Sequence, residues 1–153
     1  MKEQKIYDCV RELGREPIEG TAIIVTRTPE SVLHAAIEFA MQADRFELLV
    51  CCEDAILLFR LDNLTNSIRT SSPALVIPRE NIRATSITTA DAGMTRRIRI
   101  VTDHEELLLN AQHEITSALR TSGLWGAWHA ANLPHACDVI ACMVTENSDK
   151  EAM

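Results

Sequence analysis

Several features that identify a protein's class from its sequence are scarce or missing in this chain of 153 residues. Aromatic residues make up 4% of it, and its five glycines form neither a glycine-rich phosphate loop nor a nucleophile elbow. No apolar run approaches the roughly 18 residues of a membrane-spanning helix, and the first residues lack the apolar core of a secretory signal. These absences predict a cytoplasmic protein without a transmembrane segment.

The chain also lacks an excess of basic residues. Its 15 lysines and arginines are outnumbered by 22 acidic residues, so the formal net charge is -7. An acidic protein repels phosphate, and we therefore expect no general binding of nucleic acid. The exception is residues 79–99, where five arginines stand against two acidic residues. This basic segment is the first candidate for a functional surface.

The five cysteines do not form the even, regularly spaced set of a disulfide-rich secreted protein. Four potential metal ligands lie within 14 residues near the C-terminus: His129, His135, Cys137 and Cys142. Their spacing matches no zinc module, and on a helix Cys137 and Cys142 would point about 140° apart. We therefore predict buried thiols and a surface histidine rather than a metal site, and no cofactor.

What the sequence does contain is ordinary globular composition, with 46% apolar and 24% charged residues. A chain of this length suits one domain with a sizeable core. We predict a single domain over residues 1–146, followed by a disordered polar tail at residues 147–153.

Two helices are predicted in the N-terminal third. Residues 3–13 carry apolar side chains at helical spacing and are followed by a glycine, a common stop signal. Residues 28–44 show the clearest helical stripe. Thr28 can cap this helix, and Pro29 suits its first position.

The C-terminal third also has helical patterns. Residues 112–123 predict one helix. Residues 124–146 predict further helical pieces that Pro134 separates, because proline lacks the backbone N–H that a helix interior needs.

Strand patterns fill most of the middle of the chain. Residues 46–52 and 55–61 are apolar on both faces and are separated by Glu53 and Asp54, which predicts a hairpin between well-covered strands. The remaining predicted strands are residues 21–26, 74–77, 81–87, 96–102 and 106–111.

One segment allows an alternative. Residues 103–119 can be drawn as a single longer helix in which Asp103 and Glu106 form a capping box. We favour a strand at 106–111, because the strand at 96–102 otherwise lacks a hairpin partner. The predicted fold is α+β, a mainly antiparallel sheet of about six or seven strands with N-terminal and C-terminal helices.

The order of elements over residues 46–121 resembles the bacterial pleckstrin-homology-like domains, relatives of the PH and GRAM domains. The match consists of a hairpin, an I-P-x-x-x-I strand, an x-I-x-I hairpin and a closing helix. Its residues here are Ile77, Pro78 and Ile82, then Ile98 and Ile100, then the region of Leu108.

The resemblance implies a PH-like sheet or partial barrel. It leaves residues 124–146 as a helical extension beyond the closing helix. Members of this superfold bind lipids, peptides or other proteins, so the resemblance implies a binding role without naming a ligand.

The basic segment places its arginines on one side of a strand. Arg97 and Arg99 face one way while Ile98 and Ile100 face the other. Arg83, on the preceding strand, is expected on the same side as the arginines. Together they would form a shallow cationic face for a phosphate headgroup or an acidic protein surface.

The alternative for these arginines is that they pair with the nearby carboxylates. The candidates are Asp103, Glu105 and Glu106. The arginines would then form a solvated surface, or protect an edge strand against aggregation.

Trp125 and Trp128 are the second candidate surface. They are three residues apart and would share one face of a helix. They serve either as an anchor for a partner or a second subunit, or as a lid over the protein's own core. An apolar C-terminal segment also makes a homo-oligomer possible.

These observations predict a non-enzymatic intracellular binding or scaffolding module. It would recognise a protein partner or another anionic surface through the basic hairpin face. The alternative is a small hydrolase or metal-dependent enzyme of unknown substrate, for which the carboxylates and histidine of residues 103–106 are the available groups.

Overall fold

A computed structural model describes residues 2–27, 46–61, 73–112 and 128–144. Their helices and strands are α1 Glu3–Glu12, β1 Ile23–Arg27, β2 Glu47–Cys51, β3 Ala55–Arg60, β4 Leu75–Pro78, β5 Ile82–Ala90, β6 Thr95–Thr102, β7 Glu106–Gln112 and α3 Trp128–Ala141, with single 3-10 turns η1 Arg79–Asn81 and η2 Asp91–Gly93.

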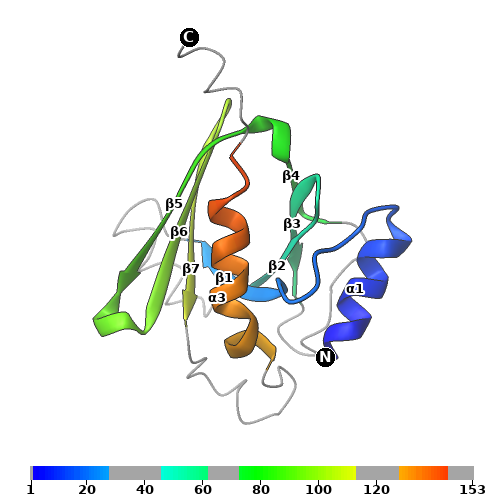
Figure 1. The fold of residues 1–153 in the computed structure, drawn as a ribbon, viewed down its shortest axis with the longest axis horizontal. Coiled ribbons are helices and arrows are strands. Elements are labelled where there is room, and N and C mark those ends of the chain that lie inside the picture. Colours follow the sequence, from blue (N-terminus) through cyan, green and yellow to red (C-terminus); the bar gives the residue numbers. More distant parts are fainter. Residues whose placement is uncertain (1, 28–45, 62–72, 113–127, 145–153) are drawn as a thin grey trace.

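The strands form one seven-stranded antiparallel sheet in the order β4-β3-β2-β1-β7-β6-β5. The sheet is bent and is not closed into a barrel. In Figure 1, α3 lies between its two halves, with β5–β7 on one side and β1–β4 on the other. The short helix α1 lies on the far side of the β1–β4 half. The α+β class and the helices at both ends are therefore confirmed.

Strand β1 joins the two halves. Its first residues pair with β2, where Ile23 lies opposite Leu49, and its last residues pair with β7, where Thr26 lies opposite Asn110. Only two residue pairs form the ladder between β1 and β7. The backbone pairing that links the two halves is therefore short.

A buried histidine of α3 extends this link. Continuing the β1–β7 register places Ile24 opposite Gln112, and the ring of His129 stands between them. The Ile24 N–H donates to Nδ1 over 3.0 Å, and Nε2 lies 2.6 Å from the Gln112 carbonyl. Because Nδ1 accepts a hydrogen bond, the ring is neutral with its proton on Nε2. The imidazole thus replaces a direct ladder bond at the point where the strands separate.

Two apolar clusters hold the layers together. The first lies between the sheet and α3, whose Leu133, Ala136 and Ile140 contact side chains of both half-sheets. The second lies between β1–β3 and α1. Strands β2 and β3 are buried along both faces because each face is covered by a helix. This confirms the predicted hairpin, whose two-residue turn is closed by the Cys52 N–H donating to the Ala55 carbonyl.

A polar network fastens α1 to the rest of the fold. The Tyr7 hydroxyl donates to Glu3 over 2.6 Å and accepts from the Gly20 N–H over 2.8 Å. Asn132 of α3 donates to the same Glu3 oxygen over 2.6 Å and to the Ala22 carbonyl over 3.0 Å. These bonds tie α1, α3 and the segment before β1 to one carboxylate.

The strand prediction for residues 106–111 is confirmed by β7, and the longer helix over residues 103–119 is wrong at its start. Strand β5 is longer than predicted and runs to Ala90. Gly93 has a φ of 89°, and the preceding Ala92 adopts a φ of 56°.

The predicted break at Pro134 is wrong, because α3 is continuous through it. The buried residues of α3 form one stripe, and Pro134 lies on the opposite, exposed face with Ala130. Proline removes the hydrogen bond to the carbonyl four residues earlier, which is that of Ala130. On an exposed face water can bond this carbonyl, so the helix continues.

Several predictions lie outside the described residues. These are the helix at 28–44, all but Gln112 of the helix at 112–123, Trp125 and the tail at 147–153. Among the helices that the structure describes, none has the length and apolar character needed to cross a membrane.

Replacing His129 should weaken the whole fold. His129→Phe keeps a ring but leaves two buried backbone groups without partners, at an expected loss of about 2–4 kcal/mol in the free energy of unfolding. His135→Phe, an exposed histidine on the same helix, should change stability by about 0.5 kcal/mol or less. Urea unfolding of both variants measures the difference. Equal stabilities would show that the imidazole bridge contributes nothing.

Tyr7 is the only tyrosine in the chain, so tyrosinate absorbance reports its ionisation alone. Burial, and then the hydrogen bond to Glu3, raise its pKa to about 12. Because the folded pKa exceeds the unfolded one, Tyr7 stabilises the fold fully below about pH 10, and this contribution is lost as the pH rises towards 12. A native absorbance titration should show the raised pKa, and the same titration in urea should return it to about 10. A native titration near 10 would mean that the network is not formed.

Candidate functional site

The sequence-predicted arginines lie on the half of the sheet formed by β5, β6 and β7. One face of this half packs on α3 through Ile98, Ile100 and Leu109. We name the opposite face the outer face. Its central side chains are Ser86, Thr88, Arg97, Arg99, Leu108 and Asn110.

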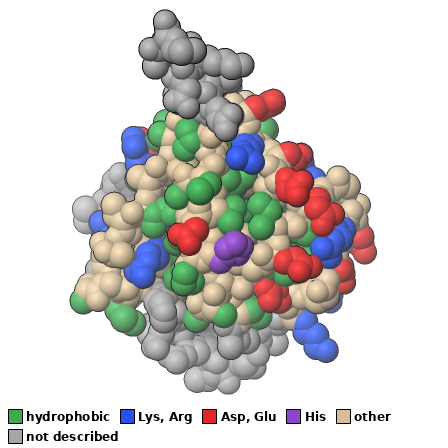
Figure 2. All heavy atoms as spheres, viewed as in Figure 1, with side chains coloured by type: hydrophobic (Ala, Val, Ile, Leu, Met, Phe, Trp, Pro, Cys, Tyr) green, Lys and Arg blue, Asp and Glu red, His purple; other side chains and the backbone are tan. Residues whose placement is uncertain are grey.

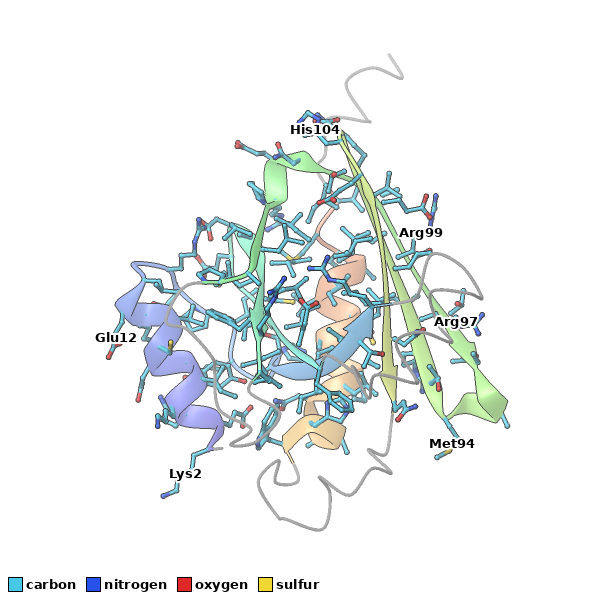
Figure 3. The ribbon with its side chains drawn as sticks, turned by 180° about the vertical axis from the view of Figure 1, so that it is seen from behind. Lys2, Glu12, Met94, Arg97, Arg99 and His104 are labelled. Carbon is cyan, nitrogen blue, oxygen red and sulfur yellow. The ribbon has the colours of Figure 1, made fainter. Side chains whose placement is uncertain are left out.

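The strand register arranges the outer face in rows. Arg97 lies between Thr88 of β5 and Asn110 of β7. Arg99 lies in the next row, between Ser86 and Leu108. Figure 3 shows Arg97 and Arg99 pointing away from α3. The predicted alternation of arginine and isoleucine along β6 is therefore confirmed.

Arg83 stands apart from the other two arginines. It occupies an irregularity at the start of β5, between Ile82 and Ala84, and has no ladder partner in β6. Its guanidinium makes a bidentate pair with Asp103, at 2.5 and 2.8 Å. The structure thus places Arg83 at the far end of β5 from the row that contains Arg97.

Arg99 is also paired. Its Nε donates to Glu106 of β7 over 2.5 Å, and both side chains are about half exposed. These two pairs match the alternative considered from the sequence, in which the arginines of this region meet Asp103 and Glu106. Exposed pairs of this kind contribute about 0–1 kcal/mol to stability, so each arginine can exchange its carboxylate partner readily.

Arg97 differs from its neighbours. It is exposed, and among the residues that the structure describes it has no ion-pair partner. Its cross-strand neighbours, Thr88 and Asn110, are neutral. A ligand can therefore contact the guanidinium of Arg97 on the outer face without displacing any carboxylate that the structure describes.

Apolar side chains flank this charge. Leu108 is 44% exposed on the outer face, and Met94 is 45% exposed at the tip of the β5–β6 hairpin, where Figure 3 labels it. The outer face thus combines one available cation with hydroxyl groups and an exposed leucine.

The two ion pairs also change the pKa values of their carboxylates. The hydrogen bond from Arg83 lowers the pKa of Asp103, and the hydrogen bond from Arg99 lowers the pKa of Glu106. In each case the arginine favours the charged form of its partner.

Of the two tryptophans, Trp128 is described. It is the first residue of α3, is partly buried and packs against the cluster beneath α1. This position agrees with a lid over the protein's own core. Trp125 lies outside the described residues.

A shallow hollow of about 270 Å³ lies beside the C-terminal end of α3, lined by Ile18, Arg79, His135, Asp138, Val139, Cys142 and Met143. Figure 2, drawn from the side of α3, shows apolar side chains gathered around a histidine and an acidic residue. Arg79 is engaged there, since it donates to the carbonyls of Glu53 and Cys142, both at 3.4 Å. It therefore fastens the end of α3 to the β2–β3 turn.

The four potential metal ligands do not converge. Both ring nitrogens of His129 are used in the bridge between β1 and β7, and Cys137 is buried against the sheet. His135 and Cys142 lie instead at the hollow. Within the described ranges, no group of three or more histidine, cysteine or acidic side chains is placed to hold a metal ion.

Burial makes the thiols of four described cysteines less acidic. Burial raises the pKa of Cys51 to about 12 and that of Cys52 to about 11, and it also raises the pKa of Cys9 and of Cys137. A raised pKa keeps a thiol protonated at neutral pH and unreactive as a nucleophile.

Comparison with known proteins gives no assignment: no protein-family model matches the chain, and no curated protein matches its sequence significantly.

Sequence reasoning missed the structural role of His129. A signal existed, because His129 shares one helical stripe with Leu133, Ala136 and Ile140. A polar residue on an otherwise apolar stripe indicates a buried hydrogen-bonding role. The interruption assumed at Pro134 concealed that stripe.

The Arg83–Asp103 pair can be tested in solution. Arg83→Gln removes the favourable charge, so the pKa of Asp103 should rise towards its ordinary value of about 3.9. Because the folded pKa is lowered, the pair stabilises the protein above that ordinary value, and the contribution is lost as the pH falls through the folded pKa. Carboxyl NMR titration measures the change, and Arg97→Gln is the control that should leave Asp103 unaltered. An ordinary pKa for Asp103 in the wild type would show that the pair does not persist in solution.

Proposed function

We propose that this chain is a non-enzymatic binding module that recognises an acidic protein surface through the outer face of β5–β7. Arg97 would make the central contact, by a charge-assisted hydrogen bond to a carboxylate of the partner. The observation that carries the proposal is the exposure of Arg97 without an ion-pair partner among the described residues, between the two neutral side chains Thr88 and Asn110.

The surroundings of Arg97 suit a protein ligand. Leu108 exposes apolar surface in the neighbouring row, and Ser86 and Thr88 carry hydroxyl groups that both donate and accept. A mixed surface of this kind fits a partner that offers a carboxylate beside apolar contacts.

Arg83 and Arg99 take a secondary part in the proposal. Their partners Asp103 and Glu106 already neutralise them, and the pairs are exposed and weak. A partner's carboxylates can exchange with these pairs at small cost. The pairs also hold each guanidinium in a defined position before a partner arrives, which lowers the entropy lost on binding.

The resemblance to PH-like domains remains part of the proposal and supports a binding role. The order of elements on which it depends is present: a β2–β3 hairpin, the strand ending in Ile77-Pro78, the β6–β7 hairpin and a helix packed on the sheet. One difference concerns the helix, since the described one is α3, which we had expected to be an extension.

The opposite charge of the rest of the chain shapes the proposed specificity. A net charge of -7 disfavours broad anionic surfaces such as nucleic acid or an acidic membrane. A protein with a small acidic spot can meet Arg97 without bringing its whole surface against the acidic parts of this chain.

Reversal of one charge tests the proposal. Arg97→Glu should weaken capture of the partner by about tenfold or more, since a charge-assisted hydrogen bond contributes about 1.5–3 kcal/mol. Lys5→Glu changes the net charge equally but lies on α1, so it should leave capture unchanged. A quantitative pull-down from lysate, with each variant first shown to be folded by circular dichroism, gives the comparison.

Salt and lipid controls complete the test. Capture that depends on Arg97 should weaken as salt screens the contact. Equal capture by the wild type and by Arg97→Glu would overturn the proposal. Sedimentation of the wild type with anionic but not neutral vesicles, lost in Arg97→Glu, would overturn the choice of a protein partner in favour of a lipid.

A further inference from the structure

The two edges of the sheet differ in a way that the proposed binding face does not explain. At one edge, β4 has four residues, ends in Pro78 and leads directly into a 3-10 turn. Short length and proline are common means by which proteins protect an edge strand from pairing with another chain.

The other edge, β5, has none of these protections over most of its length. It has nine residues, and from Ala84 to Ala90 it contains neither proline nor a charged residue. Its one irregularity lies at its start, between Ile82 and Ala84. From Ala84 onward it pairs residue by residue with β6, so the described part of β5 is regular and extended.

On its other side, the stretch from Ala84 to Ala90 has no strand partner in the described part of the chain. In an antiparallel ladder, alternate residues direct their N–H and C=O groups to each side. Half of the backbone groups from Ala84 to Ala90 therefore point towards this open edge. Figure 1 shows β5 and β4 in opposite halves of the structure, so one does not protect the other.

We propose that β5 pairs with β5 of a second copy of this chain, antiparallel about a two-fold axis near Ser86. The two sheets would join into one continuous sheet across the dimer. An isologous contact of this kind uses the same surface on both copies and closes after two subunits.

The side chains of β5 favour a second copy over an arbitrary strand. With Ser86 opposite its own counterpart, Ala84 lies opposite Thr88 and Thr85 lies opposite Ile87. Small side chains therefore meet on the outer face, and β-branched side chains meet on the other, which is a favourable combination for cross-strand pairs.

Charge also permits this self-pairing. Because residues 84–90 are neutral, no register near the two-fold axis brings like charges directly opposite each other. The arginines of the outer face lie one strand further in, on β6, and Arg99 is already paired with Glu106. The dimer would then carry two copies of Arg97 on one continuous face, which increases the avidity for a partner with two acidic sites.

This proposal is independent of the proposed function and responds oppositely to salt. Each copy carries a net charge of -7, so the copies repel each other, and screening by salt should tighten the dimer. Binding of an acidic partner through Arg97 should weaken under the same conditions. The two proposals can therefore be tested separately, because the failure of one does not imply the failure of the other.

Sedimentation equilibrium of the full chain tests the interface. The wild type should dimerise with rising concentration, and the double variant Ser86→Lys plus Thr88→Lys should raise the dimer Kd at least tenfold, because four lysines would meet at the axis. Gln112→Lys, on the same side of the sheet but in β7, should leave the Kd unchanged. A wild type that stays monomeric at high concentration, or a dimer that tolerates both lysines, would overturn the proposal.

Disulfide cross-linking shows which residues of the two β5 strands lie opposite each other. It also tests the interface without the charged substitutions, which could unfold the protein. Residues directly opposite in an antiparallel pair lie about 4.5–5.5 Å apart at Cα, which is within disulfide range. In a Cys142→Ser background, Ser86→Cys should form an oxidised dimer, whereas Gln112→Cys should not. A dimer that cross-links at Gln112→Cys and at none of Ala84→Cys, Ser86→Cys and Thr88→Cys would place the interface elsewhere and overturn the inference.

Discussion

The hydrogen-bonded junction between β1 and β7 is the constraint on which the rest of the structure depends. Without it the described strands would form two separate sheets, β1–β4 and β5–β7, each with one additional unpaired edge. The backbone ladder across this junction has two residue pairs, and the neutral ring of His129 continues it between Ile24 and Gln112. A side chain from α3 thereby completes a backbone structure. The helix that fills the space between the two halves also holds them together.

This arrangement couples the helix to the sheet more specifically than apolar packing can. Leu133, Ala136 and Ile140 supply contact area, but apolar burial is non-directional and by itself only weakly opposes rotation or translation of the helix. His129 and Asn132 do not tolerate it, since each hydrogen-bonds backbone groups of the sheet or of the segment before β1. Buried polar groups left unpaired cost about 1–3 kcal/mol each, so displaced positions of α3 are strongly disfavoured.

The sequence predicted the parts of this fold that local patterns determine. The hairpin around Glu53 and Asp54 was predictable because two apolar segments flank a two-residue turn. The alternation of Arg97, Ile98, Arg99 and Ile100 predicted which side chains face outward. Other features depend on tertiary context. Continuity through Pro134 depends on which face of α3 is exposed. The bridge by His129 depends on the register between β1 and β7, two strands that are distant in sequence.

The arginines illustrate the limit for functional sites. Composition identified residues 79–99 as basic, and the nearby acidic residues indicated that pairing was the alternative. The structure divides the set: Arg83 and Arg99 have carboxylate partners, and Arg97 has none among the described residues. The physical reason is register. Glu106 lies two residues along β7 from Leu108, the residue opposite Arg99. The residues two positions from Asn110, which is opposite Arg97, are the neutral Leu108 and Gln112.

For the proposed binding of an acidic partner, the lack of a described ion-pair partner for Arg97 on the outer face of an acidic protein has a consequence. One exposed charge supplies little affinity in water, so a partner must add apolar or backbone contacts nearby to bind firmly. The acidic remainder of the chain meanwhile repels partners whose negative charge is spread over a wide surface. Attraction at Arg97 and repulsion elsewhere therefore favour a partner by where its negative charge lies rather than by how much it carries. Such an interface gains specificity at the expense of affinity.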